Sequence, residues 1–140
     1  MAFLNEIAAQ LAGLGVGTVG TTIHIGVMPE TPDACTSIIE YGGLAPDFQF
    51  GTEGLDGETP AVQVVCRGVA YDYATPRANI KLAYEGLAKV EAETITTTGG
   101  THAFYHWIHP QQAPFLMNRD AQNRVYFACN FLAEKELSST

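Results

Sequence analysis

Three histidines lie within eight residues near the carboxyl end of the chain, and imidazole is a common metal ligand. They are His102, His106 and His109. The residues between them are rich in aromatic side chains, which favour a β-strand. On a strand, His102 and His106 share one face and His109 points to the other, so the three imidazoles do not converge on one ion. We therefore expect no metal, and we interpret these histidines as surface or interface residues.

Nucleophilic and acidic side chains do not form a recognisable catalytic pattern. The chain has three serines, Ser37, Ser138 and Ser139, and none of them lies in a G-x-S-x-G turn. Glu91 and Glu93 form a carboxylate pair of the kind that does acid–base work, but a solvated helix end explains them more simply. We therefore predict that the protein is not an enzyme and has no catalytic residues.

Residues 15–20 read GVGTVG and match the G-x-G-x-x-G pattern of dinucleotide-binding folds. In those folds the glycines follow a strand and open a helix, whose free N–H groups hold the pyrophosphate. Here the pattern follows a predicted helix and leads into a predicted strand. We interpret it as a connector and expect no cofactor.

Cys35, Cys66 and Cys129 are odd in number and far apart in the sequence. No C-x-x-C pair and no secretory signal accompanies them, which favours reduced thiols over disulfides. Cys66 and Cys129 fall at apolar positions of predicted strands. We expect them to be small core residues.

The charge of the chain is acidic and unevenly distributed. Fifteen acidic and seven basic residues give a net charge of −8, and the first 66 residues contain no Lys or Arg. An acidic surface repels nucleic-acid phosphates, which argues against binding DNA or RNA through a basic patch. No apolar run is long enough to span a membrane, and no basic residue precedes the first apolar residues. We expect a protein made in a cytoplasm, with no membrane partner.

The elements that would position these residues begin with an amphipathic helix. Apolar residues at helical spacing predict it over residues 4–14. Alternating polar and apolar residues predict strands at 22–27, 35–41 and 62–67. Two prolines after the first strand indicate a stiff loop.

The second half of the chain begins with the strongest helix signal. Thr75 is the expected N-cap, and Pro76 at the first helical position opens a helix predicted over 76–91. Strands are expected at 93–98, 102–109 and 124–131, the last two as an antiparallel pair. Alternation places one set of side chains on a common face of strand 102–109: Phe104, His106 and Ile108.

Together these elements predict an α+β protein with one domain over residues 1–140. A chain of 140 residues has the commonest size for a single domain. We expect a largely antiparallel mixed sheet with two main helices packed on one face.

A long acidic loop is expected over residues 44–60, where glycines and prolines recur and apolar residues are sparse. Loops of this length are uncommon in compact domains and are often functional. We expect this one to contact a partner.

Several short segments resemble, in order, the phage minor capsid family whose members act as tail terminators of long-tailed phages. They are EYGG at 40–43, PAVQV at 60–64, RG at 67–68, AYEGL at 83–87, QAP at 112–114 and NRD at 118–120, before Arg124. Each segment is weak alone, and their collinear order over nearly the whole chain carries the resemblance.

The resemblance implies a virion structural protein that forms a ring, commonly of six subunits, at the end of the tail tube. Such a ring limits tube length and joins the tail to the neck, so the implied partners are other copies, the tube protein and a neck or head completion protein. DNA would pass through without specific binding, and the ring would assemble in the host cytoplasm. By position, Arg67 would end a strand, and Arg119, Asp120 and Arg124 would mark the turn before the last strand.

A closed ring needs a heterologous interface, and unpaired strand edges together with a long loop would supply one. A conduit for DNA should also carry few basic contacts, because each phosphate contact adds affinity that would retain the duplex. We therefore expect some acidic residues of the first half to face the lumen or the tube. The candidates are Glu30, Asp33, Asp47, Glu53, Asp56 and Glu58.

Two other functions fit the same sequence. Another head-to-tail connector or completion protein would have the same size and composition. A small metal-binding or ligand-binding enzyme domain would use the histidines or a cysteine, and a bound metal or a deep pocket would favour it.

Overall fold

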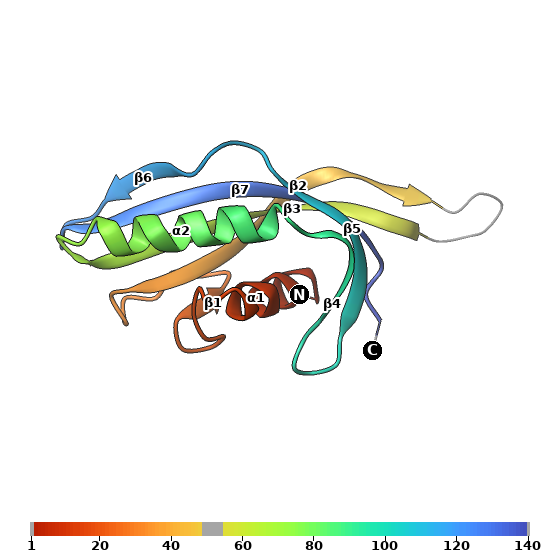
Figure 1. Ribbon diagram of the computed structural model, residues 1–140, viewed down its shortest axis with the longest axis horizontal. Coiled ribbons are helices and arrows are strands. Elements are labelled where there is room, and N and C mark those ends of the chain that lie inside the picture. Colours follow the sequence, from red (N-terminus) through yellow and green to blue (C-terminus); the bar gives the residue numbers. More distant parts are fainter. Residues whose placement is uncertain (1, 49–54, 140) are drawn as a thin grey trace.

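The computed structural model describes residues 2–48 and 55–139 and has the predicted α+β architecture (Figure 1). The described residues form two helices and seven strands. The helices are α1 (Ala2–Gly13) and α2 (Ala74–Leu87). The strands are β1 (Ile23–Ile25), β2 (Cys35–Phe48), β3 (Leu55–Ala70), β4 (Glu91–Thr96), β5 (His102–Pro110), β6 (Phe115–Arg119) and β7 (Arg124–Glu136).

The strands form one curled, mixed sheet in the order β1-β2-β3-β7-β5-β4. β6 pairs with the first part of β7, and β5 pairs with the second part. Among the described strands only β1 and β2 are parallel, and the other pairs are antiparallel. β5 and β7 are thus an antiparallel pair, as predicted, but β5 pairs with residues 131–135 of β7, and most of the predicted range 124–131 pairs with β6 instead.

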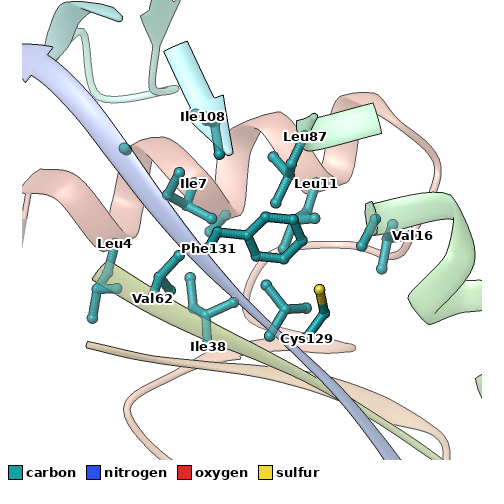
Figure 2. Close-up of a cluster of buried hydrophobic side chains, with 14 of the residues drawn as sticks. Leu4, Ile7, Leu11, Val16, Ile38, Val62, Leu87, Ile108, Cys129 and Phe131 are labelled. Atoms are coloured by element: carbon teal, nitrogen blue, oxygen red, sulfur yellow. The ribbon is translucent and has the colours of Figure 1, made fainter. Parts of the chain in front are cut away.

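The core lies between one face of the sheet and the two helices. Phe131 of β7 is fully buried and lies at the centre of this core (Figure 2). Ile7 and Leu11 of α1 and Leu87 of α2 contribute to the same buried cluster, together with Val62 of β3. Both helices therefore cover the same face, as predicted, and no helix among the described residues lies on the opposite face of the sheet.

The loop expected over residues 44–60 is largely strand. β2 continues to Phe48 and β3 begins at Leu55, so these strands form a long hairpin that projects at one end of the molecule (Figure 1). The register between β2 and β3 shifts after Tyr41, in the segment where glycines and prolines recur. At Gly43 an added Cβ would lie 2.0 Å from the carbonyl oxygen of Thr59, so only glycine allows this close backbone approach.

Backbone pairing explains why this segment is strand, although its sparse apolar residues predict a loop. The last strand was expected to end at 131, but β7 continues to Glu136 and pairs with β3 at Gly57 and Glu58. Part of the hairpin is therefore held by a third strand. Ladder hydrogen bonds of this kind do not require an alternating apolar pattern.

The start of α2 also differs from the prediction. Tyr73 occupies the N-cap position and makes no side-chain capping bond. Instead, a carboxylate oxygen of Asp72 accepts a hydrogen bond from the Thr75 N–H at 3.1 Å. Hydrogen bonds from Thr75 lower the pKa of Asp72. The helix ends at Leu87 rather than 91, and the next strand starts at Glu91.

A β-bulge changes the predicted faces of β5. Tyr105 pairs with Lys135, but Trp107 pairs with Glu134, so His106 is the extra residue. Tyr105 and Ile108 are consequently both buried, although strict alternation would separate them. The expected common face of Phe104, His106 and Ile108 is wrong for this reason.

Candidate functional site

Arg67 is buried at the end of β3 and binds the stiff loop between β1 and β2. Its Nε donates a hydrogen bond to the carbonyl oxygen of Asp33 at 2.7 Å. Its Nη2 donates to the carbonyl oxygens of Pro29 at 2.6 Å and Pro32 at 2.8 Å. The loop has few strand partners for these oxygens, so the five guanidinium donors satisfy them instead. Arg67 therefore fixes the loop against the sheet.

Arg124, at the start of β7, lies beside this loop and contacts three carboxylates. Its side chain is 4% exposed. It contacts Asp120 at 2.8 Å, Glu30 at 2.9 Å and Asp33 at 3.1 Å. Burial opposes the charged form of Arg124, but hydrogen bonds to these carboxylates raise its pKa above the usual value. The guanidinium is thus a permanent charge that holds the loop and the turn before β7 together.

Asp120 is the most strongly bound of these carboxylates. Burial acts to raise its pKa, but hydrogen bonds from the Arg124 N–H, the Tyr126 hydroxyl and the Arg124 side chain outweigh this and lower the pKa to about 2. The Tyr126 hydroxyl donates at 2.9 Å. Asp120 therefore stays ionised at neutral pH.

Five of the ten sequence-predicted site residues meet in this cluster, which we call the arginine cluster. Its members are Glu30, Asp33, Arg67, Asp120 and Arg124. Glu30 and Asp33 keep side chains that are 78% and 55% exposed, although each pairs with Arg124. Part of the negative charge that the sequence places in the first half is therefore balanced within the chain.

A second charged cluster lies between α1 and the end of β7, and we call it the lysine cluster. The Nζ of Lys135 lies 3.1 Å from a carboxylate oxygen of Glu6 and 3.3 Å from one of Glu58. Lys135 also donates to the Ser138 hydroxyl at 2.6 Å, and that hydroxyl donates to Glu6 at 2.9 Å. The Tyr105 hydroxyl donates to Glu6 at 2.7 Å. Glu58 is the only sequence-predicted site residue in this group.

Sequence reasoning missed Glu6, Lys135 and Tyr105, although two signals were present. Glu6 lies next to Ile7 within the apolar stripe of α1, and both are fully buried. Lys135 continues the inward alternation of β7 after Phe131 and Ala133. A charged residue at a position whose side chain points to the core indicates a buried ion pair, because burying an isolated charge costs too much free energy.

Three further sequence-predicted residues belong to strands at the ends of the molecule. Asp47 and Asp56 belong to the projecting hairpin of β2 and β3, and Glu53 lies outside the described residues. Arg119 ends β6 and is exposed.

The histidines and cysteines do not converge on a site in the part of the chain that the structure describes. His106 lies 3.7 Å from a carboxylate oxygen of Glu136, and His109 stacks on Trp107 with ring centroids 4.3 Å apart. Within residues 2–48 and 55–139, no three metal-ligating side chains gather around one point. In the same ranges, no helix combines the length and apolar character needed to cross a membrane.

The cysteines are buried thiols. Cys66 and Cys129 belong to the core cluster, as predicted. Burial raises the pKa of Cys66 to about 12 and that of Cys129 to about 11. Burial also raises the pKa of Cys35. These thiols are poor nucleophiles at neutral pH because the reactive thiolate is scarce.

A shallow groove of about 270 Å³ lies on the helix-free face of the sheet. Apolar side chains line most of it, among them Ile39, Val65 and Met117. Ser37 also lines the groove, and its hydroxyl is buried without a hydrogen-bond partner among the described atoms. The groove runs across neighbouring strands rather than into the core.

The fold and its clusters define a single-domain α+β protein in which arginines and a lysine tie loops and termini to one curled sheet. The family model for bacteriophage tail terminator proteins matches residues 10–137. The chain therefore belongs to the bacteriophage tail terminator family and is a structural protein of a virion tail.

One solved structure extends this comparison to the fold. A chain from the virion of a native gene transfer agent particle superposes with a TM-score of 0.57 at 16% sequence identity. The match covers 91% of this chain and 84% of that one, so the two share a fold along most of their length. No curated protein matches the sequence significantly.

Proposed function

We propose that this protein is the subunit of a tail terminator ring that caps the tail tube, limits its length and joins the tail to the neck. The observation that carries the proposal is the family match over residues 10–137. The ring has six subunits by resemblance to the family. Its partners are other copies of the chain, the tube protein and a neck or head completion protein, and it assembles in the host cytoplasm.

The sheet edges support assembly into a ring. β1 covers β2 only from Thr36 to Ile38, so the outer edge of β2 lacks a strand partner from Ile39 onward among the described residues. On the opposite side of the sheet, β6 and β4 form the edge. Two different edges on one subunit are what a heterologous, ring-closing contact requires.

The acidic residues of the first half suit a channel for DNA. Some of Glu30, Asp33, Asp47, Glu53, Asp56 and Glu58 line the bore or face the tube in this proposal. Their charges repel the phosphates, so the duplex passes without being retained. A ring structure with a basic bore would contradict this part of the proposal.

The decisive experiment removes the gene from a particle-producing strain and measures tails by negative-stain electron microscopy. We expect tubes of uncontrolled length and heads without joined tails. Expression of the wild-type protein in trans is the control and should restore a single tail length. Joined tails of normal length in the absence of the protein would reject the proposal.

Labelling then tests the position in the particle. Antibody-linked gold should mark one site per virion, where the tail meets the head. Gold along the tube or over the head would contradict a terminator ring.

A further inference from the structure

Three of the seven basic residues are buried, and the other four are exposed. Arg67, Arg124 and Lys135 are buried in the two charged clusters. The exposed cations are on α2 and the segment after it, and at the end of β6. They are Arg77, Lys81, Lys89 and Arg119.

Arg77 and Arg119 lie at the same end of the molecule, opposite the hairpin. β3 runs from the hairpin at Leu55 to Ala70, and α2 begins four residues later (Figure 1). Arg77 lies 5.9 Å from the ring centre of Phe127, and Phe127 pairs with Leu116 of β6. We call this surface the basic end and define it by Arg77, Leu116, Met117 and Arg119.

The acidic counterpart is the unpaired outer edge of β2, which we call the acidic edge and define as residues 39–48. Its described side chains include the exposed residues Glu40, Tyr41 and Leu44. The segment contains a second acid, Asp47, and no basic residue. An edge strand with exposed apolar side chains is a template for pairing with another strand.

The side chains of the two surfaces match face by face. Glu40 shares its face of β2 with the core residue Ile38, and Arg119 pairs with the core residue Val125, so both lie on the helix-bearing face. On the helix-free face, Ile39 and Met117 both line the shallow groove. A continuous sheet built from these edges would therefore place acid against base on one face and apolar against apolar on the other.

β4, which forms the same side of the sheet as β6, is a less suitable pairing partner for the acidic edge. β4 carries Glu91 and Glu93, which are exposed. Pairing β2 with β4 would place like charges near each other, which opposes association. Charge complementarity therefore favours β6 over β4 as the partner of the acidic edge.

We propose that the acidic edge of β2 in one copy pairs with β6 at the basic end of the next copy, so that the sheet continues from subunit to subunit. This proposal rests on the proposed ring and identifies its joint. Because the two edges differ, each copy offers one of each and the contact is head-to-tail.

Charge reversal with compensation tests the pairing. One variant carries Glu40→Lys and Asp47→Lys, a second carries Arg77→Glu and Arg119→Glu, and a third carries all four changes. Sedimentation equilibrium of the purified full-length chain measures self-association. We expect either pair alone to weaken association on the order of tenfold, because each converts attraction into repulsion. The fourfold variant should recover to within about threefold of wild type because the attraction returns with its signs exchanged.

A matched control reverses the same number of acids on the other free edge, through Glu91→Lys and Glu93→Lys. We expect it to leave association within about threefold of wild type. Higher salt should weaken the wild-type association, because screening shortens the reach of exposed charges from about 10 Å at 0.1 M to about 3 Å at 1 M.

Three results would overturn the proposed joint. They are a fourfold variant no better than either reversed pair, a β4 control that weakens association as strongly as the β2 reversal, and a wild-type chain that stays monomeric at its highest soluble concentration. The gene-removal experiment tests the ring function separately. Tubes of uncontrolled length after gene removal, together with any of these results, would reject the joint and leave the terminator function standing.

Discussion

Replacing Lys135 with methionine tests the buried lysine cluster most directly. Glu6 is 0% exposed and Lys135 is 1% exposed, so neither charge is solvated by bulk water. Methionine has a similar length and no charge, so the change leaves Glu6 buried without its cation. Removing one partner of a buried pair typically costs about 3 to 5 kcal/mol. The Tyr105 and Ser138 hydroxyls still donate to Glu6, so we expect the lower part of that range, about 3 kcal/mol.

Urea unfolding measures this loss. The single tryptophan, Trp107, lies in β5 and stacks on His109, so its fluorescence reports on the end of the sheet near the cluster. Far-ultraviolet circular dichroism supplies an independent probe of two-state behaviour. Lys89→Met is the matched control because Lys89 is exposed, and it should change the free energy of unfolding by less than about 0.5 kcal/mol.

A double-mutant cycle separates the ion pair from general packing. In a Glu6→Gln background the amide still accepts a hydrogen bond from Tyr105 but carries no charge, so Lys135→Met should cost much less there. We expect a coupling energy of about 2 kcal/mol. A loss below about 1 kcal/mol for Lys135→Met in the wild-type background, or a coupling energy near zero, would refute the reasoning.

Three further outcomes follow from other parts of the structure. Phe131→Ala should lower the free energy of unfolding by about 3 to 5 kcal/mol because it leaves a cavity at the centre of the core; a loss below about 1 kcal/mol in urea unfolding would place that side chain outside the core. Since the folded-state pKa of Asp120 is lowered to about 2, its contribution is present above the unfolded pKa of about 4 and is lost as the pH falls between those values. Acid titration followed by circular dichroism should therefore show a smaller loss of stability over that window for Asp120→Asn than for wild type, and equal losses would contradict the assigned hydrogen bonds. Because burial raises the pKa of Cys66 to about 12 and of Cys129 to about 11, both thiols should react with Ellman's reagent only after unfolding, and rapid labelling of the native protein would show that they are accessible.

The periodicity of apolar residues along the chain was enough to predict the main helices and strands. The apolar stripe of α1 and the spacing around Ile80 and Leu87 predicted both helices, and alternation from Val125 to Phe131 predicted β7. These patterns are local, because each residue's face follows from its own element. The collinear short segments identified the family, and the family model confirmed it.

The ends of strands and the faces of their side chains were less predictable where pairing with a distant strand determines them. β2 and β3 extend into the segment expected to be a loop because ladder hydrogen bonds, with support from β7, hold a stretch that has few apolar residues. The bulge at His106 changes the face of Ile108, and it arises from the register between β5 and β7. Neither the pairing nor the register can be derived from β5 or β2 alone.

The sequence by itself determined the composition, the two helices, six of the seven described strands and the family, because these depend on residue type and on spacing within each element; β6 was not predicted. It also singled out Glu30, Asp33, Arg67, Asp120 and Arg124, but as residues for the lumen or an interface. Only the tertiary structure decided that they meet one another in the arginine cluster, since residues up to 94 positions apart in the chain become hydrogen-bond partners there. Burial of Lys135 against Glu6 was likewise decided in three dimensions, because the pairing of charges depends on which surfaces the fold brings together.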